Sequence, residues 1–311
     1  MGAGLLRSPR LRRLASRRAL GALAGVLVLG FLLAGLVDGW STVSAFDWQV
    51  DPLWLAGGLA ALLALYLAGG LLYAEIIARL HDPPPPRRQT VSVWARSLLG
   101  RYVPGTVLMV LGRTAMGQRS GVPGRVTVAA TTYEQALTVA AAGVASAGFL
   151  LAYGEPGRRA WVWAVVAVVP AALIVLHPRC FGPLSGWLLA RLRRQPLPAL
   201  LSGRQVAGLF GCYLVVMGVL GVVAWALVRA AAGEAAGGLA FVGLAYVLSF
   251  LVSMLAFVFP SGLGVREGAF ALALTHTLPT SVAVACAVGV RLVVTLFELA
   301  FVAAAAVIGR R

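Results

Sequence analysis

Long uninterrupted runs of apolar residues constrain this chain more than any other feature of its sequence. Several runs approach or exceed the ~20 residues that an α-helix needs to cross the hydrocarbon core of a bilayer. The chain of 311 residues is 60% hydrophobic and only 12% charged, whereas charged residues make up ~25% of a typical soluble domain. We therefore predict an all-α fold, a polytopic transmembrane helix bundle with about 7–8 membrane segments, two of them broken or re-entrant.

The basic residues are all arginine, and their distribution predicts a topology. Nineteen of the 26 arginines fall in segments that we assign to the cytoplasmic side, as the positive-inside rule expects. We predict residues 1–18 as a basic cytoplasmic N-terminus and residues 19–308 as a single transmembrane domain in the plasma membrane. Because the formal charge of +16 follows this topology, we expect anionic membrane lipids as partners and no nucleic acid.

Short polar segments divide the apolar runs into crossings. Residues 38–52 form an acidic outer loop, and residues 81–88, with four successive prolines, form a stiff cytoplasmic connector. The basic link 177–205 is predicted as an amphipathic helix on the inner leaflet, with a solvated loop as the alternative. The predicted crossings are residues 19–37, 53–77, 126–153, 160–176, 206–228, 239–259 and 281–308.

The first broken element is predicted near residues 91–113. Arg101 interrupts the apolar run, Pro104 and Gly105 break it near its middle, and Arg113 follows at once. Because basic residues flank both ends, two half-helices that meet at this break describe a re-entrant hairpin. A half-helix that ends inside the membrane exposes unpaired backbone groups and a partial charge, which transporters use to hold ions and headgroups.

The second broken element is predicted near residues 259–278. Residues 260–268 read PSGLGVREG, so glycines and an adjacent Arg-Glu pair separate two apolar runs. The run 265–277 would form a helix of ~20 Å, too short to cross a core of ~30 Å. Glu267 would take the third helical position after an N-cap at Gly264, where a carboxylate stabilises the first turn.

Seven ionisable residues lie at apparent membrane depth, where each costs a few kcal/mol unless it is paired or hydrated: Arg96, Arg101, Glu134, Arg266, Glu267, Arg291 and Glu298. Glu134 is expected roughly 12 Å from the cytoplasmic edge. Arg291 and Glu298 share a helix face but stand ~10 Å apart along the axis, so each needs a partner elsewhere. The candidate substrate-binding residues are Arg101, Arg113, Glu134, Arg266, Glu267, Arg291 and Glu298. The candidate break residues are Pro104, Gly105, Pro260, Gly262 and Gly264.

Two interpretations of these charges remain open from the residues alone. One is a set of structural ion pairs that fixes the packing of the helices. The other is a polar cavity whose arginines bind a phosphate headgroup, since the guanidinium fork matches phosphate oxygens. The coincidence of the charges with both breaks favours the second interpretation, because structural pairing would not need the breaks.

Enzyme signatures are missing from the sequence. There is no HExxH, GxSxG or P-loop motif, and Cys180, Cys212 and Cys286 lack metal-ligand spacing. We therefore expect no catalytic activity, no metal and no cofactor.

Two stretches resemble the lysylphosphatidylglycerol synthase transmembrane region, a family of flippase-like integral membrane proteins. Residues 260–268 are similar to its proline, glycine-glycine-x-glycine, Val-Arg-Glu signature, with Ser261 where a glycine is common. Arg291 is similar to the arginine that follows in the family's last helix. Residues 100–105 (GRYVPG), then Arg113 and Glu134, resemble the family's Arg-Tyr-x-Pro-Gly element and its downstream glutamate. The resemblance spans roughly residues 91–308.

The resemblance implies a membrane domain that moves lipids between leaflets, such as aminoacylated phosphatidylglycerol or polyprenyl-linked sugars. In full-length synthases an aminoacyl-transferase domain follows this region, and none follows here, so we expect a stand-alone bacterial member that does not aminoacylate lipid. We hypothesise a flippase or transporter for an anionic or aminoacylated phospholipid or a polyprenyl-linked lipid. The alternatives are a non-catalytic membrane subunit that scaffolds or regulates a lipid- or glycan-modifying enzyme, and an intramembrane transferase. The partners would then include that enzyme or a second copy of the chain.

Overall fold

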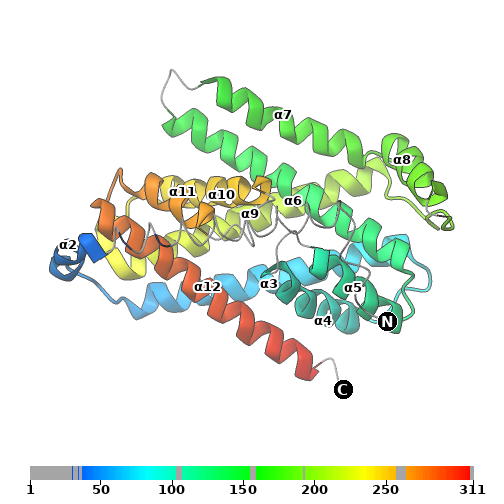
Figure 1. The fold of residues 1–311 in the computed structure, drawn as a ribbon, viewed down its shortest axis with the longest axis horizontal. Coiled ribbons are helices and arrows are strands. Elements are labelled where there is room, and N and C mark those ends of the chain that lie inside the picture. Colours follow the sequence, from blue (N-terminus) through cyan, green and yellow to red (C-terminus); the bar gives the residue numbers. More distant parts are fainter. Residues whose placement is uncertain are drawn as a thin grey trace, which may run out of the picture.

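The computed structural model describes residues 30, 34, 37–102, 107–154, 159–191, 193–256 and 264–308. Over these residues the chain is helical and contains no strand, which confirms the predicted all-α bundle (Figure 1). The elements in chain order are α2 (Trp40–Ala45), α3 (Pro52–Leu80), α4 (Arg87–Ser97), the 3₁₀ turn η2 (Leu98–Tyr102), α5 (Val107–Arg119), α6 (Gly124–Tyr153), α7 (Arg159–Leu176), α8 (Pro178–Arg191), α9 (Gly203–Ala232), the 3₁₀ turn η4 (Gly233–Ala236), α10 (Leu239–Leu255), α11 (Val265–Leu274) and α12 (Thr280–Ile308).

Four of the described helices are long and apolar enough to cross a membrane: α3, α6, α9 together with η4, and α12. A fifth span results if α7 and α8, which meet at a bend of 67°, are counted as one. α8 lies within the link predicted as an amphipathic helix, so that link is helical over 14 residues. The predicted first crossing, residues 19–37, lies almost entirely outside the described residues.

Local sequence signals start the two helices that pack most extensively on each other. The Asp51 carboxylate accepts hydrogen bonds from the backbone N–H groups of Leu53 (2.8 Å) and Trp54 (3.3 Å) at the start of α3. Ser202 and Gln205 close a capping box at the start of α9. α3 starts at one end of the bundle and α9 at the other, so the two helices lie antiparallel and side by side.

The two ends of the bundle differ in charge. The end on the right of Figure 1 carries residues 81–86, 120–123 and 193–202, and arginines flank all three segments. We call it the basic end. The opposite end carries residues 46–51 and 275–279. The positive-inside rule assigns the basic end to the cytoplasm, and this orientation stays a prediction.

Two short helix pairs enter the bundle from opposite ends. α4 runs inward from the basic end, and α5 packs against α4 and returns to that end (Figure 1). α10 runs inward from the opposite end, and α11 packs against α10 and returns there. Each pair is followed by a long helix, α6 or α12. Both halves of the chain therefore contain the predicted helix–break–helix unit, which we call a hairpin.

The residues of the two breaks are described only in part. Pro104, Gly105, Pro260 and Gly262 lie outside the described residues. Gly264 is described, and it precedes α11 with φ of +82°, a left-handed conformation that residues with a Cβ rarely adopt. The predicted N-cap at Gly264 is confirmed, and α11 has only 10 residues, as expected for a half-helix.

Glycines allow close contact between helices where the hairpins pack. A Cβ built on Gly221 of α9 or on Gly243 of α10 would lie 3.1–3.2 Å from the backbone of the other residue. On α3, a Cβ at Gly69 would lie 2.8 Å from the ring of Trp94. Small residues permit such close approach of membrane helices. Gly69 thereby seats the indole of α4 in the interior, beside α6.

Candidate functional site

Three ion pairs join six of the seven ionisable residues predicted as the site. The pairs are Arg113 with Glu134, Arg101 with Glu298, and Arg291 with Glu267. The prediction that Arg291 and Glu298 each find a partner outside their own helix is therefore confirmed. The first pair lies within the first hairpin and α6, the third within the second hairpin and α12, and the second joins the two halves.

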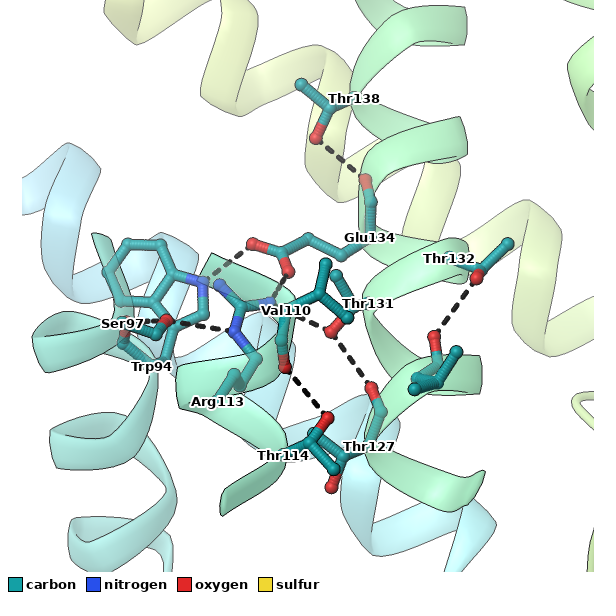
Figure 2. A network of polar contacts seen from close by, with 11 residues as sticks. Trp94, Ser97, Val110, Arg113, Thr114, Thr127, Thr131, Thr132, Glu134 and Thr138 are labelled. Carbon is teal, nitrogen blue, oxygen red and sulfur yellow. Dashed lines mark hydrogen bonds and ion pairs between the residues drawn. The ribbon is translucent and has the colours of Figure 1, made fainter. Parts of the chain in front are cut away.

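The Arg113–Glu134 pair lies at the centre of a hydrogen-bond network between α4, α5 and α6 (Figure 2). The Trp94 indole N–H donates to Glu134 Oε1 at 2.6 Å. Arg113 donates through Nε to the Ser97 hydroxyl at 3.0 Å and through a terminal nitrogen to the Thr131 hydroxyl at 3.2 Å. Each carboxylate oxygen of Glu134 thus has a donor, and the network fixes the first hairpin to α6.

This network is closed to solvent. The Arg113 side chain is 0% exposed, and its guanidinium lies 4.5 Å from the centre of the Tyr73 ring of α3, within the range of a cation–π contact. Arg113 therefore has partners at Nε, at Nη1 and on one face, while Nη2 is buried without a hydrogen-bond partner among the described residues. Of the two interpretations of the sequence, structural ion pairing fits this pair in the described conformation, and its contact with a substrate stays a prediction.

The Arg101–Glu298 pair connects the first hairpin to α12 and to α3. Arg101 Nε lies 3.2 Å from Glu298 Oε1, a second nitrogen bonds Oε2, and the Tyr66 hydroxyl donates to Oε2 at 2.7 Å. Glu298 is buried, whereas the Arg101 side chain is 35% exposed. One buried carboxylate therefore connects η2, α3 and α12, and the side chain of its partner Arg101 remains partly exposed.

We expect Tyr66→Phe to lower the free energy of unfolding by about 1 kcal/mol, the scale of a hydrogen bond between membrane helices. Glu298 would keep Arg101 but lose its donor from α3. Thermal unfolding of the purified protein in detergent micelles measures the effect. Tyr153→Phe is the matched control, because the Tyr153 side chain lies at the exposed end of α6. Equal stability of the two variants would contradict this role of Tyr66.

The second hairpin holds its charges at the start of α11. Glu267 Oε2 accepts a hydrogen bond from the Gly264 backbone N–H at 2.7 Å, so the predicted stabilisation of the first turn is present. Its other oxygen, Oε1, lies 3.2 Å from Nε of Arg291 on α12. A single carboxylate thus caps the half-helix and neutralises an arginine of the neighbouring long helix.

Arg266 differs from the other three arginines. It is 8% exposed, and among the described residues it forms no ion pair, while its Nε has no hydrogen-bond partner. Its guanidinium lies 4.4 Å from the ring centre of Tyr246 and 5.0 Å from that of Phe250, both on α10. Aromatic faces attract a cation but carry no net negative charge. The seven candidate residues, four arginines and three glutamates, therefore retain one positive charge in excess.

Both hairpins form an ion pair with α12, at positions that are close along its axis. Glu298, the partner of the first hairpin, follows Arg291, the partner of the second, by two turns of α12, about 10 Å along the axis. A crevice lined by Arg266, Glu267 and Arg291 has an empty volume of about 150 Å³. It is too narrow here for a lipid headgroup, so a ligand could reach Arg266 only if α11 moves relative to α10 or α12.

Sequence patterns did not identify the neutral residues of the site. Tyr66, Trp94 and Ser97 carry no charge and belong to no recognised motif, so a search for buried charges does not find them. Tyr246 and Phe250 are four residues apart on α10, a spacing that places two aromatic rings on one helix face, and this could have indicated a cation site. Arg96, which the sequence places at membrane depth, is exposed and takes no part. The described residues contain no group of three or more His, Cys, Asp or Glu side chains suited to a metal ion.

Comparison with known proteins gives one match. A family model described as the lysylphosphatidylglycerol synthase TM region matches residues 18–301, which include all seven candidate site residues. No curated protein and no solved structure matches the chain.

Proposed function

The chain belongs to the lysylphosphatidylglycerol synthase transmembrane region family, and from this premise we propose that it is a lipid flippase or transporter. Its cargo would be a lipid with an anionic headgroup: an anionic or aminoacylated phospholipid, or a polyprenyl-linked lipid. It would act in a bacterial plasma membrane, with the basic end in the cytoplasm as the positive-inside rule predicts.

One observation carries the proposal: Arg266 is buried, and among the described residues it forms no ion pair. A buried cation without a carboxylate partner is unfavourable, and in a membrane protein such a residue is a functional candidate by default. A phosphate that reached Arg266 would supply the missing negative charge and two acceptor oxygens for the guanidinium fork. The position of Arg266 at the start of a half-helix is the arrangement by which transporters hold anionic groups.

The other charged residues take different parts in this proposal. Arg291 lies beside Arg266 in the same crevice, so a phosphate could draw it from Glu267 and bind between the two arginines. Arg101 is partly exposed and would receive the headgroup from the first hairpin. Glu298 and Glu267 balance charge when the cargo is absent. Arg113 and Glu134 fix the first hairpin, and any contact of theirs with the cargo requires that the closed network opens.

A vesicle assay with a charge-matched pair of variants tests the proposal. The full chain is reconstituted with a trace of fluorescent phosphatidylglycerol, and a membrane-impermeant reductant then reports how fast labelled lipid reaches the outer leaflet. Because hydrogen bonds to charged groups contribute ~1.5–3 kcal/mol, we expect Arg266→Gln to slow phosphatidylglycerol movement about 10- to 100-fold. Arg229→Gln, which removes an arginine that pairs with the exposed Glu234, should retain the wild-type rate.

Thermal unfolding separates this role from a structural one. If Arg266 only stabilised the fold, Arg266→Gln would unfold at a lower temperature, whereas removing an uncompensated buried charge should leave stability unchanged or raise it. Wild-type lipid movement in Arg266→Gln would contradict the role of this residue. No lipid movement by the wild-type protein, together with a stably copurifying enzyme, would instead favour the membrane-subunit alternative.

A further inference from the structure

A second candidate site lies between the end of α3 and the start of α9. The two helices enclose a groove of about 620 Å³ at the basic end of the bundle. This volume falls within the range of ~300–1,000 Å³ that is typical of ligand sites. No residue that lines this groove also lines the crevice at Arg266, which lies between α10, α11 and α12. The groove is therefore separate from the Arg266 crevice.

The mouth of the groove carries an excess of positive charge. Glu75 lies 2.9 Å from a terminal nitrogen of Arg79 and 3.2 Å from one of Arg87. Arg204 lines the groove from α9, and no ion pair is found for it among the described residues. The lining itself contains two arginines, Arg79 and Arg204, and one glutamate, so it carries one positive charge in excess. A ligand of this mouth is therefore expected to be an anion.

The lining becomes apolar toward the middle of the bundle. Arg204 and Arg79 lie near the basic end, while Leu209 and Cys212 continue the wall along α9 and Leu72 faces them from α3. Arg204 and Cys212 are eight residues apart, about 12 Å along the helix. A charged mouth at the membrane surface that continues into an apolar channel matches a phospholipid, whose phosphate lies at the interface and whose chains point inward. A free phosphate ion would not use the apolar part.

From this arrangement we propose that the groove binds one anionic phospholipid of the leaflet at the basic end. Its phosphate lies between Arg79 and Arg204, and its glycerol backbone and first methylenes lie along Leu72 and Leu209. The site does not depend on lipid movement by the hairpins, so it stands if the transport function fails.

Native mass spectrometry of the full-length protein tests the headgroup contact. Phosphatidylglycerol and phosphatidylcholine are supplied at equal concentrations to the detergent-solubilised protein, and the lipid bound per protein is counted. We expect Arg79→Gln/Arg204→Gln to bind phosphatidylglycerol at least tenfold more weakly. The control is Arg191→Gln/Arg194→Gln, which removes the same charge from exposed positions at the same end and should bind as the wild type does. Equal binding by both double variants would overturn the site.

Cys212 supplies a second measurement that does not depend on those variants. Cys180 and Cys212 are exposed and Cys286 is buried, so in a Cys180→Ala protein a maleimide should react first at Cys212. We expect phosphatidylglycerol to slow this labelling severalfold and equal concentrations of phosphatidylcholine or inorganic phosphate to leave it unchanged. Protection by inorganic phosphate would show a site for a soluble anion. Equal protection by phosphatidylcholine would show packing of lipid without headgroup recognition, and either result overturns the proposal.

Discussion

Replacing Arg113 by methionine is expected to lower the free energy of unfolding by about 3–5 kcal/mol, because it leaves Glu134 as an uncompensated buried charge. The loss would spread through the network, since the hydroxyls of Ser97 and Thr131 also lose their donor. We would measure thermal and denaturant-induced unfolding of the purified protein in detergent micelles.

The double variant Arg113→Met/Glu134→Met should recover most of that stability, because it removes both charges and leaves apolar side chains in their place. Arg87→Met is the control for loss of an arginine from an ion pair. Its side chain is 74% exposed, and its partner Glu75 keeps Arg79, so the expected loss is about 0–1 kcal/mol. If the single variant were as stable as the double variant, the unpaired carboxylate would not be the cause.

Replacing Gly100 by alanine is expected to destabilise the protein by about 3 kcal/mol, the upper part of the range for overpacking. A Cβ at this position would lie 2.5 Å from the backbone nitrogen and 2.6 Å from Cα of Met109. Backbone atoms cannot turn aside as a side chain can, so η2 and α5 must separate. That separation would also displace the adjacent Arg101 from Glu298, and thermal unfolding would report the sum of the two effects.

Gly112→Ala is the matched control on the same hairpin. A Cβ at Gly112 meets nothing within 4 Å, and alanine in a helix interior is favoured over glycine by roughly 0.5–1 kcal/mol. We therefore expect the two alanine substitutions to change stability in opposite directions. A similar loss in both would indicate that α5 tolerates no alanine at all and would remove the argument from backbone contact.

Hydropathy and the positions of glycine and proline were sufficient to predict an all-α bundle with two broken elements, because membrane helices must be long, apolar and bounded by polar residues. They did not show that residues 239–259, predicted as a crossing, form the short helix α10, from which the chain turns back. α9 starts at Gly203, three residues before the apolar run from which we predicted it, because Ser202 and Gln205 cap the helix outside that run. α10 ends at Leu255, four residues before the predicted end at 259. Apolar composition cannot locate such an end, because the residues after it are equally hydrophobic.

The sequence did not show which arginine pairs with which glutamate at the candidate site. The seven-residue spacing of Arg291 and Glu298 showed that they share a face and cannot pair, but their partners Glu267 and Arg101 lie on α11 and η2, and no periodicity describes how these elements pack against α12. Glu134 lies on the predicted long helix α6, but its partner Arg113 is on α5, whose packing against α6 cannot be predicted from spacing. The isolation of Arg266 is likewise a property of the packed helices.

The shortness of the first hairpin has a consequence for how the protein is made. At 11 residues with three arginines, α4 cannot partition into the bilayer by itself during synthesis, because it is too short and too polar. Arg101 acquires its carboxylate only when Glu298, 197 residues later, has left the ribosome, roughly 10–40 s at ordinary rates of translation. The first hairpin can therefore reach its final place only after α12 has been synthesised, so a helix of the second half completes the first half.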